Sequence, residues 1–247
     1  GSIYGMLPMF HSFGLLLCVI YSVETASRAV LFPTFDPELV AQAAKKFPPT
    51  FIPAVPPMFD RLARVAADGK LDLSQVVYSI SGAMTLTPAV VGRWEKLAGS
   101  MLNEGYGMTE TSPVALANPF DDARKIGAIG IPFPSTDIRV VRQSEPGVEV
   151  ELGEIGELLI AGPQVFQGYW NRPQDSAEGP ARRRLVAYRG PGRPGRGRLC
   201  HRGGSQEGTD HHGRLQRLHQ RGGGRGGLRA RCGRIRRGGP GPRRRSR

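Results

Sequence analysis

The residues best suited to chemistry lie at 103–113, which read Asn-Glu-Gly-Tyr-Gly-Met-Thr-Glu-Thr-Ser-Pro. A glycine-flanked ring, Tyr106, stands three residues before the hydroxyl of Thr109, and the carboxylate of Glu110 follows directly. This grouping suits a nucleotide, because a flat ring can stack on a base, a hydroxyl can reach a phosphate oxygen, and a carboxylate can bind Mg²⁺. The spacing therefore predicts a nucleotide site.

Two loops must come together to build such a site. One reads Ser-Ile-Ser-Gly-Ala-Met at 79–84, and the other covers 104–110. Each follows a predicted strand, and ligands of open parallel sheets sit beyond the carboxyl ends of the strands. Glycines at 82, 105 and 107 let the backbone approach a ligand closely. We therefore expect both loops at one edge of a sheet.

The elements that position these loops alternate between strand and helix. Asp36-Pro37 has the form of an N-cap followed by proline at the first helical position, and Thr87-Pro88 repeats it. The alternation predicts an α/β fold with a parallel, doubly wound sheet. Short apolar or strand-like runs lie at 29–32, 51–55, 76–80 and from 101, and helices are expected at 37–46, 57–67 and 88–98, with a buried helix at 14–20.

The pattern changes after residue 126. Short β-branched runs at 138–141, 147–152 and 157–160, with Gly and Pro between them, predict a smaller antiparallel β subdomain. We therefore expect three units: an α/β part at 1–125, a β-rich subdomain at 126–178, and an Arg/Gly/Pro-rich, disordered tail at 179–247.

The stretch at 103–113 resembles the YGxTE signature of the adenylate-forming (AMP-binding) superfamily, most of all the long-chain fatty acid–CoA ligases. The resemblance implies that Tyr106 stacks on adenine, that Thr109 contacts phosphate and that Glu110 binds Mg²⁺, so Thr109 and Glu110 are the expected catalytic residues. The nucleotide-binding set it implies is Gly82, Ala83, Met84, Glu104, Gly105, Tyr106, Gly107, Met108 and Thr109.

A further loop at 8–14 resembles the family's Pro-x-Phe-His-x-x-Gly motif. It implies that His11, together with Ser81, lines the acyl site, although a structural role for His11 stays open. The similarity covers nearly all of 5–175 and implies the large N-terminal domain of the family.

The resemblance also implies a reaction in two steps. The acid attacks the α-phosphorus of ATP to give acyl-adenylate and pyrophosphate, and the CoA thiol then displaces AMP. ATP, Mg²⁺ and CoA are the expected cofactors, and fatty acid and CoA are the expected small-molecule partners, with no specific nucleic acid. Without a secretory signal or an apolar run of about 20 residues, we expect a cytoplasmic protein, with peripheral membrane attachment left open. Cys18 is expected in the core.

The tail differs sharply in charge from the rest of the chain. Residues 181–247 hold 21 of the 34 basic residues and only two acids, a formal charge of +19, whereas residues 1–180 carry −6. One reading is a nucleic-acid-binding protein with a basic RG-rich arm, which would bind phosphate backbones in a salt-dependent way. The arm lacks the repeated units and interleaved aromatics typical of that class.

A frameshift explains the tail better. Possible codons for 185–191, read one nucleotide later, give Trp-Leu-Arg-Thr-Gly-Asp, which resembles the family's ribose-binding motif. The same shift at 205–212 gives Arg-Lys-Lys-Glu-Leu-Ile-Ile, and at 213–221 Thr-Gly-Gly-Phe-Asn-Val-Tyr-Thr-Asn-Glu, similar to the hinge and the next strand. Three matches in the family's order indicate a frame slip between about 176 and 184.

Three parts of the resembled enzymes are not found in this reading frame: the phosphate loop, the ribose-binding Asp, and the C-terminal domain with its lysine. We therefore expect weak ATP binding and no measurable ligase activity from this chain.

Overall fold

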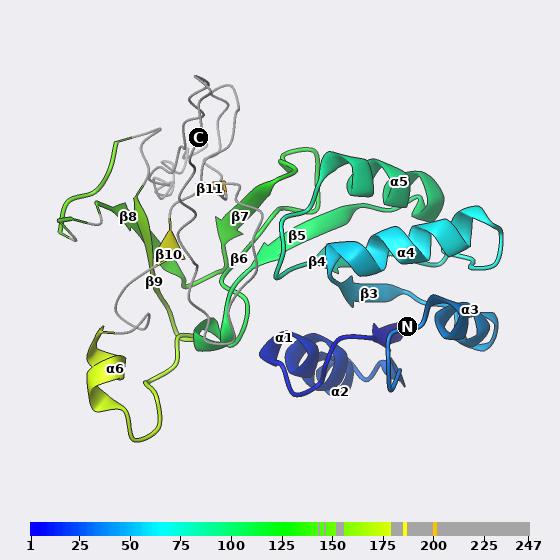
Figure 1. The fold of residues 1–247 in the computed structure, drawn as a ribbon, viewed down its shortest axis with the longest axis horizontal. Coiled ribbons are helices and arrows are strands. Elements are labelled where there is room, and N and C mark those ends of the chain that lie inside the picture. The colour runs from blue at the N-terminus through cyan, green and yellow to red at the C-terminus, as the bar shows by residue number, and fades with distance from the viewer. Residues whose placement is uncertain (143, 146, 152–155, 179–184, 187–199, 202–247) are drawn as a thin grey trace, which may run out of the picture.

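The computed structural model describes residues 1–142, 144–145, 147–151, 156–178, 185–186 and 200–201. Its framework is an eight-stranded sheet in the order β11-β7-β6-β5-β4-β3-β1-β2, beside a three-stranded sheet in the order β10-β9-β8 (Figure 1). The strands of the large sheet are β1 (Ser2–Gly5), β2 (Arg28–Leu31), β3 (Phe51–Ala54), β4 (Tyr78–Ser81), β5 (Leu102–Tyr106), β6 (Leu116–Ala117), β7 (Ala128–Pro132) and β11 (Cys200–His201).

The first five strands of the large sheet run parallel. β1 lies between β2 and β3, and β4 lies between β3 and β5. Beyond β5 the sheet turns antiparallel through β6, β7 and β11. The predicted α/β fold with a parallel sheet is confirmed.

Three helices cross between the parallel strands, and each begins with proline: α3 (Pro37–Lys46), α4 (Pro56–Ala67) and α5 (Pro88–Ala98). Asp36 caps α3, since its Oδ1 accepts from Glu38 N at 2.9 Å. Thr87 caps α5 through Val90 N at 3.4 Å. The side-chain oxygens satisfy backbone N–H groups that have no partner inside the helix, so both predicted helix starts are confirmed.

The main core lies between these helices and the parallel strands. Trp94 of α5 is fully buried and donates its Nε1–H to Ser79 Oγ of β4 at 3.0 Å. Phe59 of α4 meets the Trp94 ring edge-on, with centroids 4.7 Å apart. Aromatic burial of this kind contributes much of a domain's apolar stabilisation. The packing of Trp94 and Phe59 anchors β4, the strand that leads into the segment 79–84.

The helical segment after β1 is one run of three parts: α1 (Ser12–Gly14), the π-helical η1 (Leu15–Ile20) and α2 (Tyr21–Glu24). Phe13 and Cys18 pack into a small separate cluster, but Leu15 is 44% and Ile20 49% exposed. The expectation of a buried helix at 14–20 is therefore wrong on one side, because only the face toward β1 and β2 is covered within the described residues.

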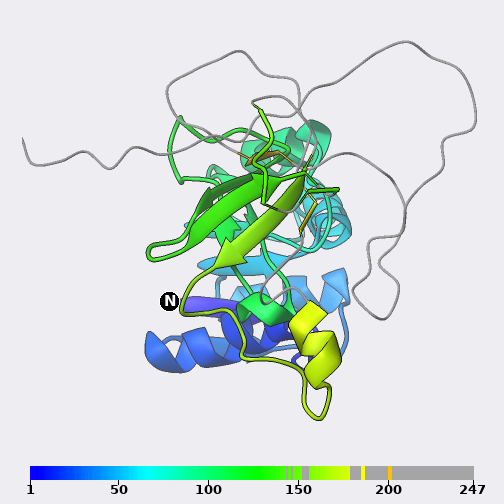
Figure 2. The same cartoon turned by 90° about the vertical axis from the view of Figure 1, so that its left-hand side faces the viewer.

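The smaller sheet is formed by β8 (Asp137–Val141), β9 (Glu157–Ala161) and β10 (Leu185–Val186), and Figure 2 shows it from the front with α6 (Pro173–Glu178) at its lower end. The expected strand at 147–152 is wrong in its described part: a turn brings the chain back so that Val141 and Glu149 form a single bridge. β7 lies past residue 126 but belongs to the large sheet.

Of the stretch expected as a tail, the structure describes two short strands beyond residue 178. β10 pairs antiparallel with β9, and β11 pairs antiparallel with β7. At these four residues there is paired strand where the sequence predicts disorder. The rest of 179–247 lies outside the described residues, and with it most of the frameshift motif at 185–191 and all of the two at 205–221.

Candidate nucleotide site

Loops 79–84 and 104–110 lie side by side at the carboxyl edge of the parallel strands. β4 and β5 are adjacent, with Ser81 opposite Glu104. A buried hydrogen bond joins the two segments, since Leu86 N donates to Glu104 Oε1 at 3.1 Å. The predicted adjacency of the two loops is confirmed.

Glu104 is buried and braces three segments. Its second carboxylate oxygen, Oε2, accepts from Gly127 N at 2.6 Å, so β5, the loop before α5 and the turn before β7 meet at one side chain. Both oxygens therefore bind the protein, a positioning role that the sequence analysis, which grouped Glu104 with the nucleotide-binding residues, did not anticipate.

The turn at 82–84 begins with buried Gly82 and continues with two exposed residues. Ala83 takes a left-handed conformation with φ of 64°, and Met84 N donates to Gly82 O at 2.8 Å. Ala83 and Met84 are exposed. A side chain at Gly82 would meet the Phe13 ring, since a Cβ there would lie 3.0 Å from Phe13 Cζ. Left-handed alanine is strained by about 1 kcal/mol or more, and such strain clusters at binding loops.

Tyr106 is the last residue of β5, and Gly107 follows it directly. The Tyr106 ring is half-buried against the second core cluster, which includes Leu116 and Leu158. A Cβ at Gly107 would lie 1.7 Å from Pro113 O, so the backbones of the two residues approach as only glycine allows. The fold therefore requires glycine at position 107, in addition to the role in ligand approach that the sequence predicts for it. Gly105 and Met108 lie in the same partly exposed stretch.

The loop at 8–14 reaches both nucleotide loops. Ser12 Oγ lies 3.3 Å from Thr109 Oγ1, and Phe13 packs over Gly82. His11 is exposed, and its Nδ1 accepts from Phe13 N at 3.1 Å, which caps α1. The structure therefore places the expected acyl loop beside the expected nucleotide loops. Sequence reasoning missed Ser12 and Phe13, whose contacts span long separations in the chain.

Ser81 is fully buried at the end of β4, and its hydroxyl has no hydrogen-bond partner among the described residues. A buried hydroxyl without a partner costs about 1–3 kcal/mol. It therefore leaves a donor and an acceptor unused next to Gly82.

Glu110 is held by the segment that follows β9. Its Oε1 accepts from the Tyr169 hydroxyl at 2.6 Å, and its backbone oxygen accepts from Phe166 N at 2.9 Å. Burial, and then the hydrogen bond to Glu110, raises the pKa of Tyr169, so its phenol stays a donor at neutral pH. Nothing in the local sequence around Tyr169 indicates a contact across 59 residues, so sequence reasoning missed it.

The donors at this edge fit a cation that arrives with a nucleotide. Glu110 supplies one carboxylate, and the Thr109 hydroxyl beside it is exposed. Mg²⁺ is usually bound by one or two carboxylates together with substrate phosphates. Within the described parts of the chain, no group of three or more His, Cys, Asp or Glu side chains could hold a metal without such help.

The profile of the family described as "AMP-binding enzyme" matches residues 2–170. The chain belongs to this family. It is 40% identical over 169 residues to a long-chain-fatty-acid–CoA ligase of Yersinia pestis, and 37% identical over 175 residues to one of Bacillus subtilis. These matches cover 68% and 71% of the chain but only 30% and 31% of the relatives. The AMP-binding chain thus spans less than a third of their length.

Solved structures agree with this assignment. A long-chain-fatty-acid-CoA ligase from Archaeoglobus fulgidus is 31% identical with a TM-score of 0.63, over 72% of this chain and 37% of that one. Apo MatB from Rhodopseudomonas palustris is 26% identical with a TM-score of 0.66, over 81% and 39%. The fold is therefore that of part of an adenylate-forming enzyme.

The alternative reading, a nucleic-acid-binding protein, finds no support in these comparisons, and its basic arm lies almost wholly outside the described residues. As for membranes, the helices that the structure describes are all too short or too polar to span a bilayer.

Proposed function

We propose that this chain is part of an ATP-dependent fatty acyl-CoA ligase, with its nucleotide site at loops 79–84 and 104–110 and its acyl site beside loop 8–14. The three expected units, 1–125, 126–178 and 179–247, belong to this proposal. The ligase names of the relatives support the reaction class.

One observation carries the proposal: three segments from distant parts of the chain are fastened together at one sheet edge. Glu104 binds Leu86, Phe13 covers Gly82, and Ser12 meets Thr109. An adenylating enzyme must bring a carboxylate and the α-phosphorus of ATP together, and placement of reactants supplies a large part of such catalysis. The edge gathers the loops that this placement requires.

The proposed roles follow from the chemistry of each group. Tyr106 stacks on adenine beside the turn at 82–84, and the Thr109 hydroxyl contacts phosphate. Glu110 would hold Mg²⁺, which neutralises phosphate charge in the transition state. His11 and Ser81 line the acyl site, Ser81 with its unused buried hydroxyl.

Binding of a non-hydrolysable acyl-adenylate, such as a palmitoyl sulfamoyl adenosine, tests the site by calorimetry. We expect Tyr106→Ala to weaken binding by about tenfold or more, because base stacking is worth about 1–3 kcal/mol. The control variant is Tyr78→Phe. Tyr78 is exposed, and its ring packs on Phe120. Equal affinities for Tyr106→Ala and the unaltered chain would refute the stacking role.

The expectation from the sequence, weak nucleotide binding without turnover, is a prediction with its own test. Thioester formation from palmitate, ATP and CoA is followed by mass spectrometry. Acyl-CoA above the level of a Glu110→Gln variant would contradict this prediction.

A coumaroyl analogue in the same binding assay tests the acyl class, since one relative at 33% identity is a probable 4-coumarate–CoA ligase of Dictyostelium discoideum.

A further inference from the structure

Glu110 is attached at two points to one distant segment. The Tyr169 hydroxyl donates to its carboxylate at 2.6 Å, and Phe166 N donates to its backbone oxygen at 2.9 Å. The backbone bond fixes where the residue sits, and the phenol fixes how its carboxylate is turned. A short hydrogen bond to a carboxylate is among the stronger kinds in proteins.

Tyr169 is itself held in place. Its ring meets the Phe166 ring at 75°, with centroids 4.8 Å apart. Its backbone N–H donates to Ser176 Oγ at 2.8 Å, and the Ser176 hydroxyl donates to Arg172 O at 2.6 Å. A donor fixed by its own ring packing and backbone loses little entropy when it holds a partner.

This arrangement leaves half of the carboxylate for another ligand. Oε1 accepts from the phenol, whereas no hydrogen bond to Oε2 is found within the described residues. Carboxylates that bind metals are commonly oriented by such a hydrogen bond from an outer partner, and loss of that partner costs about 10–100-fold in metal affinity.

We propose that Tyr169 is a positioning residue, which orients the Glu110 carboxylate so that Oε2 can bind the divalent cation brought by the nucleotide. The inference rests on the proposed function, because it needs a nucleotide at loops 79–84 and 104–110. Two other roles for the contact are possible outcomes of the test. The contact could hold the loop without affecting cation binding, or the phenol could compete with the cation for the carboxylate.

The test uses the full chain and Mn²⁺ as the probe. The Mn²⁺ concentration that gives half-maximal binding of an ATP analogue is measured, with free Mn²⁺ followed by electron paramagnetic resonance. Tyr169→Phe keeps the ring against Phe166 and removes the donor. We expect it to raise the required Mn²⁺ concentration by about tenfold. Nucleotide binding in EDTA should stay unchanged.

Tyr78→Phe is the control and should leave the Mn²⁺ requirement unchanged. An unchanged Mn²⁺ requirement in Tyr169→Phe would show that the contact only holds the loop. A lowered Mn²⁺ requirement would show that the phenol competes with the cation. Either result overturns the inference. If Glu110→Gln leaves the Mn²⁺ requirement intact while nucleotide still binds, the cation role of Glu110 fails and the inference with it. Absence of any nucleotide binding by the unaltered chain would overturn the proposed function itself.

Discussion

Glu104 shows how one side chain can hold the segments of a site together through its contacts with the protein. Its two oxygens each accept a backbone N–H, from Leu86 and from Gly127, and the residue is 8% exposed. The carboxylate is therefore more than a member of a motif. It decides the relative position of the loops on either side of it.

Glu104→Gln should destabilise the fold by about 2 kcal/mol, because the amide nitrogen would face a backbone N–H and leave it unsatisfied. Glu149→Gln is the matched control: Glu149 pairs with Arg139 at the surface, so its change should stay within about 0.5 kcal/mol. Urea unfolding measures both. Similar midpoints for the two variants would contradict the bracing role.

Cys18 is buried in the small cluster behind loop 8–14, and burial raises the pKa of its thiol to about 11. At about pH 8, below that value, the thiol of the folded chain should stay protonated and unreactive. In a variant with Cys200→Ser and Cys232→Ser, reaction with a disulfide reagent should be at least about 100-fold slower than after unfolding in guanidinium. Rapid native labelling would show that the cluster opens.

At the scale of elements, local signals predicted most of the framework. Asp36 and Thr87 cap α3 and α5 as expected, because capping and proline act within one turn. The adjacency of the two loops followed from the parallel order of β4 and β5. The contacts of Ser12 with Thr109 and of Tyr169 with Glu110 did not, since they depend on where distant segments come to rest. Exposure of η1 was missed for the same reason.

Two glycines differ in whether the surrounding structure requires a residue without a side chain. A Cβ at Gly107 would strike Pro113 O, so Gly107→Ala should cost about 2–3 kcal/mol and weaken nucleotide binding. Gly92 is exposed within α5 and has open space around it, so Gly92→Ala should stabilise by about 0.5–1 kcal/mol. Thermal unfolding distinguishes them, and a stabilised Gly107→Ala would refute the close approach.

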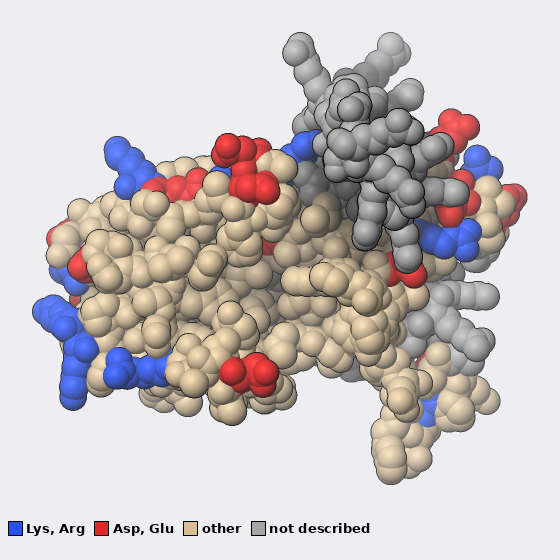
Figure 3. Space-filling model, turned by 180° about the vertical axis from the view of Figure 1, so that it is seen from behind, with Lys and Arg blue, Asp and Glu red and all other residues tan. Residues whose placement is uncertain are grey.

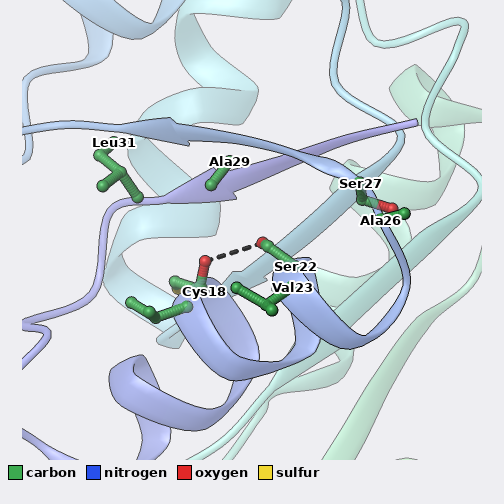
Figure 4. A pocket seen from close by; sticks show the side chains of 8 residues that line it. Cys18, Ser22, Val23, Ala26, Ser27, Ala29 and Leu31 are labelled. Atoms are coloured by element: carbon green, nitrogen blue, oxygen red, sulfur yellow. Dashed lines mark hydrogen bonds between the residues drawn. The ribbon is translucent and has the colours of Figure 1, made fainter.

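At the scale of the whole molecule, the face seen in Figure 3 carries its charges mainly along the edges. β2 is the last strand of the large sheet, and its outer edge is unpaired among the described strands. Beside it lies an apolar pocket of about 280 Å³ between η1, α2 and β2, lined by residues that include Cys18, Val23 and Leu31 (Figure 4). Open apolar edges favour association.

Val23 is 78% exposed beside this pocket. Val23→Lys should therefore reduce self-association, measured by light scattering at micromolar concentration. Gln42→Lys adds the same charge on the exposed side of α3 and serves as the control. Equal scattering from both variants would assign the effect to charge alone.

The frame slip near residues 176–184 is tested at the level of the gene. We expect a one-nucleotide shift there to restore the Thr-Gly-Asp motif and the hinge in one continuous frame. Sequencing of the region that encodes 172–190 decides it, and codons that yield no such motif in any frame would end the hypothesis.

The attachment of Glu110 to the segment after β9 gives the molecule a mechanical linkage. Phe166 and Tyr169 lie only a few residues beyond the smaller sheet, yet they bind the backbone oxygen and the carboxylate of Glu110 beside the larger one. A rigid-body displacement of the smaller sheet would therefore pull on Glu110 directly. Movement of the smaller sheet and the proposed cation binding by Glu110 would then be coupled through these two contacts rather than through diffuse packing.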